Sequence, residues 1–249
     1  PYLYNETKGV AFDRFCPFLE QLPAKSIVVL HACCHNPTGA DLTVEQWEKI
    51  AEIFKERDLI PFLDMAYQGF SKGIKEAAAA IHIFAKTGLP VFIATSFSKS
   101  FSLYSERIGA LTIITENKEE QERVTSQIKS KVRAIYSSPP SFGAYLVHYV
   151  LADDELRASW EAELAEMRDR IKAMRVKFVD LLNSKQDKVD FSFINDQAGM
   201  FSYSGLSADQ VEKLKKEYAI YTVNSGRICI AALNEHNIEV AADAVVKVL

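Results

Sequence analysis

Short apolar runs alternate with segments of helical periodicity along the first half of the chain. The apolar runs lie at residues 26–30, 59–63, 91–95 and 108–114. Runs of this length bounded by polar residues predict buried strands, and the segments between them predict helices from Thr43, over 77–86 and over 116–132. Alternating strands and helices favour an α/β fold, with a largely parallel sheet and helices on both of its faces.

The pattern changes near Asp153. From there apolar residues recur every three or four positions up to Leu181, which predicts one long helix with a single buried stripe. Strand-like segments follow at 191–194 and 200–203. Helices are predicted from Ser207 and from about His236, with another apolar run at 228–232 between them. We therefore expect a larger unit at residues 1–160 and a smaller α+β unit at 161–249.

Composition narrows the function classes. The chain has 249 residues, 48% of them hydrophobic, and a net charge of −4, which gives no support for a nucleic-acid or anionic-membrane partner. No apolar stretch approaches the roughly 20 residues of a membrane span, and residues 1–5 lack the features of a signal peptide. The four cysteines form no disulfide framework, which is typical of a reducing cytosol, so we expect a cytoplasmic protein.

Lys99 is the strongest candidate for chemistry. It lies in the run SFSKSFSLYSERIG at 96–109, with hydroxyls and aromatic rings around it and no acidic residue within six positions on either side. An amine must lose its proton to act as a nucleophile, and such a setting favours that loss. The hydroxyls and Arg107 would suit a phosphate group. The alternative for this run alone is a lysine at the edge of a strand.

The segment His31-Ala32-Cys33-Cys34-His35 suggests metal ligands at first sight. Zinc would need these donors to converge, whereas neighbouring side chains of an extended segment point to opposite faces, and no second cluster is near in sequence. We therefore favour a strand that ends in a turn at residues 36–39, and we expect no metal. That turn would lie at the carboxyl edge of the sheet, where open α/β sheets bind ligands.

Asp64 follows the second apolar run, and Tyr67 follows three residues later. A carboxylate there could cap a helix, or it could pair with the protonated ring nitrogen of a cofactor. The chain has no G-x-G-x-x-G, P-loop, G-x-S-x-G or H-E-x-x-H sequence, which weakens dehydrogenase, kinase, serine-hydrolase and zincin assignments.

Five segments occur in the order seen in class I pyridoxal-phosphate aminotransferases. They are HNPTG at 35–39, DMAYQGF at 64–70, SFSK at 96–99, ERIG at 106–109 and SGR at 225–227. The chain resembles the bacterial aspartate and aromatic (tyrosine) aminotransferases most strongly. Residues 136–140 and 199–206 look more like the aromatic branch.

The resemblance implies pyridoxal 5'-phosphate as the cofactor and gives each residue a role. Lys99 would form the internal aldimine and carry the proton between substrate and cofactor. Asp64 would pair with the pyridinium nitrogen, and Asn36 and Tyr67 would bind the phenolic oxygen. The phosphate would be bound by Ser96, Ser98 and Arg107.

The same resemblance implies substrate contacts. Arg227 would bind the substrate α-carboxylate, with Asn36 and Phe201 beside it. Arg133 would reach across a homodimer to the distal carboxylate of a dicarboxylic substrate in the other subunit; taken alone, it would be a surface arginine on a charged helix.

The resemblance further implies a fold-type-I pyridoxal-phosphate transferase, of which this chain is the carboxyl-terminal portion. Family members have more than a third of their length before the point where this chain starts, so part of the cofactor cradle would be absent. The implied reaction is a ping-pong transamination between an aromatic or dicarboxylic amino acid and a 2-oxo acid. The alternatives are an inactive remnant that acts only by dimerising and, less strongly indicated, another pyridoxal enzyme such as a β-lyase.

Overall fold

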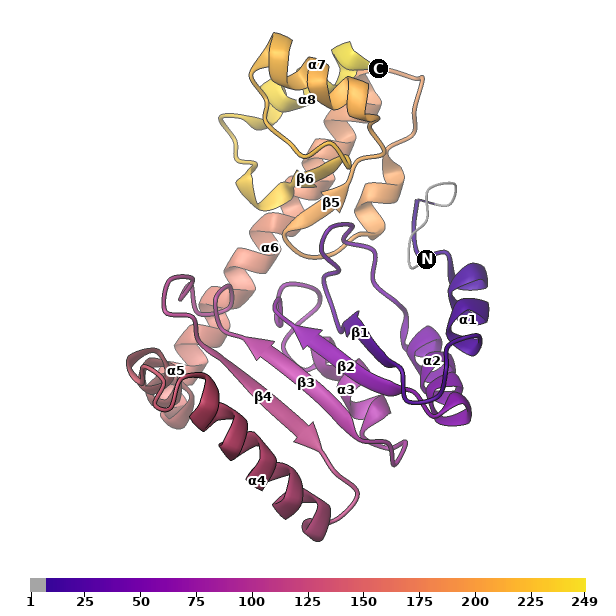
Figure 1. Ribbon diagram of the computed structural model, residues 1–249. Helices are drawn as coiled ribbons and strands as arrows, with labels where there is room; N and C mark the ends of the chain where they lie inside the picture. Colours follow the sequence, from indigo (N-terminus) through magenta and orange to yellow (C-terminus); the bar gives the residue numbers. More distant parts are fainter. Residues whose placement is uncertain (1–7) are drawn as a thin grey trace.

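A four-stranded sheet forms the centre of the larger unit in this computed structural model, which describes residues 8–249. Its strands are β1 (Ile27–His31), β2 (Ile60–Met65), β3 (Val91–Ser96) and β4 (Gly109–Ile114), in the order β1-β2-β3-β4 (Figure 1). β1, β2 and β3 are parallel, which confirms the mostly parallel sheet. β4 is antiparallel to β3 because a turn, with no crossover helix, joins the two strands.

The larger unit also contains α1 (Phe12–Glu20), α2 (Val44–Arg57) and α3 (Ala79–Phe84), the last preceded by the 3-10 turn η1 (Glu76–Ala78). α2 packs against both α1 and α3. Leu30, Leu63 and Ile93 share one register row of the strands and are buried in the same core as Phe54 of α2 and Phe84 of α3. α2 begins at the predicted capping box, in which the side chains of Thr43 and Gln46 each accept a backbone N–H of the other residue.

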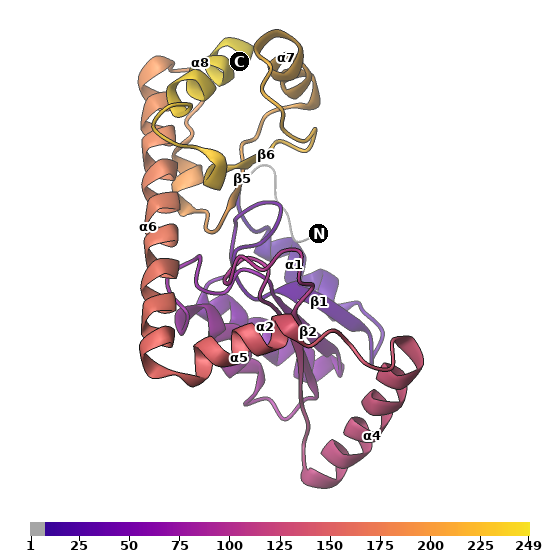
Figure 2. The same cartoon turned by 90° about the vertical axis from the view of Figure 1, so that its left-hand side faces the viewer.

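The other face of the sheet is apolar and partly uncovered. Val29, Phe62, Phe92 and Ile113 form one register row, and Ile27 and Val29 are 63% and 60% exposed. The expectation of helices on both faces is therefore wrong for the described chain. α4 (Lys118–Ile135) is helical as predicted but has no buried residue, and Figure 2 shows it extending away from the sheet.

The long helix α6 (Asp154–Lys185) runs from the sheet to the smaller unit (Figures 1 and 2). The Asp153 carboxylate caps it by accepting the backbone N–H groups of Glu155 and Leu156, and its buried stripe includes Leu164 and Phe178. It is preceded by α5 (Phe142–Ala152), which the sequence pattern had not indicated. The predicted boundary after residue 160 falls inside α6 and remains a prediction. No helix of the described chain is long and apolar enough to cross a membrane.

The smaller unit is built on α6. It contains the antiparallel pair β5 (Phe201–Tyr203) and β6 (Arg227–Cys229), the helices α7 (Ala208–Tyr218) and α8 (Ile238–Val248), and the 3-10 turns η2 (Ser192–Asp196) and η3 (Ile230–Ala232). The strand expected at 191–194 is wrong. Phe191 and Ile194 are both buried, and side chains three apart point to the same side in a 3-10 turn but to opposite sides in a strand. The run at 228–232 is a strand only as far as Cys229.

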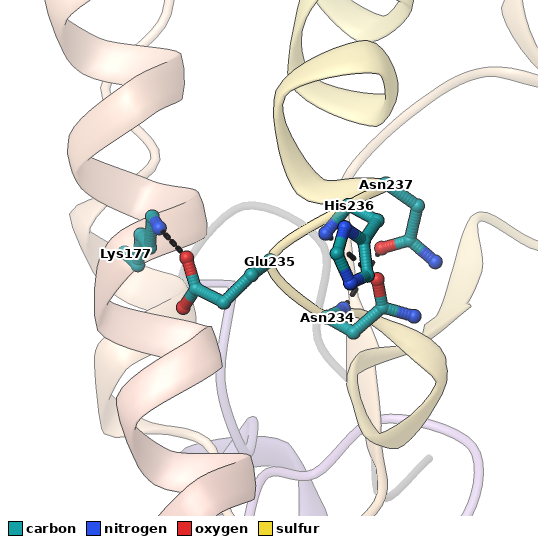
Figure 3. Close-up of polar contacts among 5 residues, drawn as sticks. All are labelled: Lys177, Asn234, Glu235, His236 and Asn237. Carbon is teal, nitrogen blue, oxygen red and sulfur yellow. Dashed lines mark hydrogen bonds and ion pairs between the residues drawn. The ribbon is translucent and has the colours of Figure 1, made fainter.

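The loop between η3 and α8 is fixed to α6. Figure 3 shows the ion pair between Lys177 of α6 and Glu235, beside which the side chains of Asn234 and Asn237 accept backbone N–H groups of the loop. Arg170, two turns earlier on α6, donates over 3.0 Å to the carbonyl of Leu233 in this loop and over 2.9 Å to that of Ala231 in η3. β6 is thereby held in a defined position relative to α6.

Candidate active site

The turns that follow β1 and β2 meet at one edge of the sheet. His31 and Asp64 are register partners at the ends of these parallel strands, and the N–H of Ala32 donates to the Asp64 carbonyl over 2.9 Å. The Asn36 side-chain amide donates to the Tyr67 hydroxyl over 3.3 Å. The two turns that the sequence placed at the carboxyl edge are therefore in direct contact.

Lys99 lies in the turn that follows β3. Its Nζ is 4.7 Å from the centroid of the Tyr67 ring, and the side chains of Ser98 and Ser100 around it are buried. Among residues 8–249 no carboxylate lies within ion-pair distance of this amine. β3 ends at Ser96, so Lys99 lies in the turn three residues beyond this interior strand of the sheet.

Asp64 is the penultimate residue of β2 and is half-buried. A turn rather than a helix follows it, so its carboxylate caps no helix. No donor in the described part of the chain bonds this carboxylate. Burial raises the pKa of Tyr67, and the charge of Asp64 adds to this increase. The hydrogen bond from Asn36 lowers the Tyr67 pKa and so offsets part of the increase. The carboxylate is thus available to a cationic partner beside Tyr67 and Lys99.

The predicted phosphate ligands lie in one hairpin. Ser96 pairs with Gly109 at the end of the β3–β4 ladder, and the N–H of Phe97 donates to the Ile108 carbonyl over 3.2 Å. Ser98 follows Phe97, and its N–H donates to the Ser96 hydroxyl over 3.3 Å. Arg107 precedes Ile108 on the other side of the hairpin and is exposed. The backbones of all three residues thus lie at one end of this hairpin, where Nη1 of Arg107 donates to the Tyr104 carbonyl over 3.0 Å.

Arg227, the first residue of β6, joins this group from the smaller unit. Its Nη1 donates to the side-chain oxygen of Asn36 over 2.9 Å, and its guanidinium carbon is 4.6 Å from the centroid of the Phe201 ring. Phe201 in turn meets Tyr67 edge to face, with 6.2 Å between ring centroids. Asn36, Tyr67, Lys99, Phe201 and Arg227 therefore form one continuous set of contacts.

Arg133 is not part of this set. It lies exposed on the last turn of α4 and forms no hydrogen bond or ion pair with another residue of the described chain. Its predicted role toward a second subunit remains a prediction.

The two histidines beside Asn36 contact each other. The rings of His31 and His35 lie 5.2 Å apart in an edge-to-face arrangement, and Nδ1 of His35 is 2.7 Å from the Thr38 hydroxyl. Burial, with a smaller contribution from His31, lowers the pKa of His35 to about 4. Within residues 8–249 no three His, Cys, Asp or Glu side chains are grouped to hold a metal ion.

Sequence reasoning missed the residue that fixes the Asn36 turn. The half-buried carboxylate of Asp41 accepts the backbone N–H groups of Cys34 and His35 over 2.7 and 2.8 Å. Burial raises the pKa of Asp41, and these two hydrogen bonds lower it in part. The loop conformation brings this carboxylate back to backbone six and seven residues earlier, and no sequence pattern indicated that contact.

Arg175 of α6 was also missed. It is only 4% exposed and donates to the Gly199 carbonyl and to the Ser202 hydroxyl, which holds the strand that carries Phe201. Burial lowers the pKa of Arg175. The available signal was its spacing, four residues after Ile171 and three before Phe178, which places an arginine on the predicted apolar stripe.

Comparison with known proteins gives the family that the five sequence motifs indicated. Residues 1–245 match the family model of aminotransferase class I and II, and the chain belongs to this family. It is 57% identical to an aspartate aminotransferase of Pseudomonas aeruginosa and 51% identical to an aromatic-amino-acid aminotransferase of Escherichia coli, with 100% of the chain aligned in both. It covers 62% and 63% of those proteins, so it spans less than two thirds of the length of these relatives.

Solved structures agree. The fold superposes with a TM-score of 0.98 on the aromatic-amino-acid aminotransferase of Burkholderia pseudomallei covalently bound to pyridoxal phosphate, at 55% identity over 100% of this chain and 62% of that one. The chain thus has the fold of the corresponding portion of a fold-type-I aminotransferase and belongs to the aspartate and aromatic branch, as the five motifs indicated.

Proposed function

We propose that the native protein that carries this chain catalyses transamination between an aspartate-type or aromatic amino acid and a 2-oxo acid, with pyridoxal phosphate as cofactor. The observation that supports this most strongly is the position of Lys99. Its Nζ lies 4.7 Å from the Tyr67 ring centroid, in a cluster that also holds Asn36 and Arg227, and no described carboxylate pairs with it.

The donor set fits this cofactor. The Asp64 carboxylate is half-buried and accepts no hydrogen bond from residues 8–249, so it suits a protonated ring nitrogen. The hydrogen-bonded pair of Asn36 and Tyr67 suits a phenolic oxygen. When bound, pyridoxal phosphate supplies an electron sink for the bond that breaks at the substrate α-carbon. Ser96, Ser98 and Arg107 would hold its phosphate group.

The chain's own residues then have defined tasks. Lys99 supplies the amine that holds the cofactor and moves a proton to and from the α-carbon, the work of a positioned base. Arg227 binds the α-carboxylate of the substrate with its guanidinium fork, because Asn36 and the Phe201 ring fix its plane. The same residues serve both half-reactions of a ping-pong cycle. In the first, an amino acid gives up its amino group and departs as a 2-oxo acid; in the second, another 2-oxo acid receives that amino group.

A homodimer completes the proposal. Phe142, Tyr145 and Tyr149 lie three and four positions apart on α5, so they share one helix face, and all three are exposed. A stripe of this kind is typical of a protein interface. Arg133 would then act in the partner's site. The four free cysteines support a cytoplasmic location.

One alternative rests on a specific observation. The exposed apolar sheet face, with Ile27 and Val29, favours a chain that is inactive alone and acts only by associating with a complete subunit. A β-lyase would share the lysine, so only product analysis separates it from a transaminase.

The decisive experiment is an absorbance titration with pyridoxal phosphate followed by glutamate, on the native protein and on Lys99→Ala. We expect pyridoxal phosphate to give a new absorbance band with the native protein, and glutamate to shift this band to that of pyridoxamine phosphate. In Lys99→Ala we expect neither the new band nor the shift. If the protein shows no cofactor band, the inactive alternative holds. A band that glutamate leaves unchanged, with pyruvate or ammonia released from another amino acid, would indicate a lyase.

A further inference from the structure

The first half of α6 reaches both turns of the candidate site. Trp160 contacts the turn that carries Lys99, and Leu164, one helical turn later, packs against the turn that carries Tyr67. At Gly69 a Cβ atom would lie 2.5 Å from a terminal carbon of Leu164, so the helix and this turn are in van der Waals contact. Residues four apart share one face of a helix, so one surface of α6 supports both groups.

The contact of Trp160 with the Lys99 turn is specific. Its indole N–H donates over 2.6 Å to the carbonyl of Ser100, the residue directly after Lys99. The indole ring also stacks on Phe101, with centroids 4.5 Å apart and planes inclined by 21°. Phe101 meets Phe97 edge to face over 5.5 Å, so aromatic rings flank the lysine turn on both sides of Lys99 in sequence.

Apart from the bond between the Phe97 N–H and the Ile108 carbonyl at the end of the β3–β4 ladder, the backbone of this turn is held by local hydrogen bonds. Within it, the N–H of Phe101 donates to the Phe97 carbonyl over 3.1 Å and the N–H of Ser102 to the Lys99 carbonyl over 3.2 Å. Both bonds are local and would persist if the turn moved as a unit. The Trp160 bond, which spans 60 residues of sequence, anchors the turn to α6 instead.

We propose that Trp160 is a positioning residue for Lys99: by fixing the Ser100 carbonyl and stacking on Phe101, it holds the lysine amine over the Tyr67 ring. The proposal rests on the proposed function, because the position of the Lys99 amine matters only if that amine binds the cofactor. A lysine side chain has four rotatable bonds, so the place of its amine depends on how firmly its backbone is held. Trp160 touches none of the residues assigned to substrate, and its effect must therefore come through Lys99.

The test compares Trp160→Phe with Trp47→Phe. Phenylalanine at 160 keeps a ring for Phe101 but removes the donor to Ser100. Trp47, the other tryptophan of the chain, is buried in α2 against Phe84 at 6.3 Å, away from the site, and controls for general loss of packing. Phe101→Leu removes the stacking and keeps the indole N–H, and so gives a second variant should Trp160→Phe fail to fold.

Two measurements on the native protein separate positioning from stability. One is the rate at which borohydride fixes pyridoxal phosphate on Lys99, located by peptide mass spectrometry; the other is the thermal unfolding temperature. We expect Trp160→Phe to slow trapping about tenfold, the order of effect of one lost hydrogen bond, and Phe101→Leu to slow it by less. We expect Trp47→Phe to lower the unfolding temperature with an unchanged trapping rate.

Steady-state kinetics supply the third readout: kcat should fall in Trp160→Phe while KM for the amino acid stays unchanged. Wild-type trapping rates in both Trp160→Phe and Phe101→Leu would overturn the inference and leave the proposed function intact. So would a loss of trapping in Trp47→Phe equal to that in Trp160→Phe. If the wild-type protein itself traps no cofactor on Lys99, the proposed function fails and this inference with it.

Discussion

Arg227 donates a 2.9 Å hydrogen bond to the side-chain oxygen of Asn36, a residue 191 positions earlier in the chain. The bond joins the two-stranded sheet of the smaller unit to the turn that follows β1. Because the Asn36 amide group also donates to Tyr67, one side chain connects the proposed carboxylate site with the proposed cofactor site. The amide can satisfy both neighbours only with its oxygen toward Arg227 and its nitrogen toward Tyr67.

Asp64→Asn should weaken cofactor binding. The amide has nearly the same shape as the carboxylate but no charge to stabilise a protonated ring nitrogen, so we expect the Kd for pyridoxal phosphate to rise tenfold or more, on the order of one lost charge-assisted hydrogen bond. Proton abstraction should slow by several orders of magnitude, because the electron sink depends on that proton. Fluorescence titration and single-turnover kinetics measure the two effects.

Asp58→Asn is the matched control for this change. Asp58 ends α2 at the surface, where it pairs with Lys25 over 2.8 Å. Its loss should alter neither Kd nor rate. An unchanged affinity in Asp64→Asn would show that this carboxylate is not a cofactor ligand.

How far the sequence predicted this site depends on how local each signal is. Asn36, Asp64 and Lys99 all follow runs of continuous apolar residues, so their position at one sheet edge followed from the strand pattern. The partners Asp41 and Trp160 did not follow. Asp41 acts through a loop conformation that no periodic pattern indicates, and Trp160 acts on backbone that only tertiary packing brings near. The same limit applies to the sheet: periodicity identified the strands, but not which face the helices would cover.

His35→Gln should make stability less dependent on pH. Burial lowers the pKa of His35 from 6.5 to about 4, so below pH 6.5 the unfolded chain binds a proton that the folded protein does not. The stabilisation from neutral His35 is complete above pH 6.5 and is lost as the pH falls toward 4. It amounts to at most about 3 kcal/mol of unfolding free energy.

Urea unfolding at several pH values between 7 and 4 measures this effect. The wild-type protein should lose more stability over that interval than His35→Gln does. His82→Gln, at an exposed position of α3, should follow the wild-type curve. Parallel curves for wild type and His35→Gln would contradict the assigned pKa.

Gly199→Ala should destabilise the junction between the smaller unit and the Asn36 turn. Gly199 has a φ of +84°, and a Cβ atom there would lie 2.5 Å from the Cβ of Cys34. The positive φ costs roughly 1–2 kcal/mol and the clash about 1–3 kcal/mol more. Gly88→Ala is the control, because Gly88 has a similar φ of +79° and nothing within 4 Å of an added Cβ. Denaturant unfolding of both variants isolates the clash, and equal losses would show that the turn relaxes freely.

Substrate range provides the last prediction, through Arg227 and Arg133. Every amino acid has an α-carboxylate, so Arg227→Gln should lower kcat/KM for aspartate and phenylalanine alike, by about one to two decades for a lost charge-assisted pair of roughly 1.5–3 kcal/mol. Arg133→Gln should lower kcat/KM far more for aspartate, because phenylalanine has no distal carboxylate.

The control for Arg133 is Arg123→Gln, an exposed arginine on the same helix, which should change neither value. Because Arg133 lies outside the contact set of its own chain, its effect also requires a second subunit. Mixing Arg133→Gln with Lys99→Ala subunits therefore tests the geometry. In a mixed dimer, the site that keeps Lys99 belongs to the Arg133→Gln chain and receives an intact Arg133 from its partner, so aspartate activity should reappear. If no aspartate activity reappears in mixed dimers, Arg133 does not act across an interface, and the dicarboxylic specificity must be assigned to another residue.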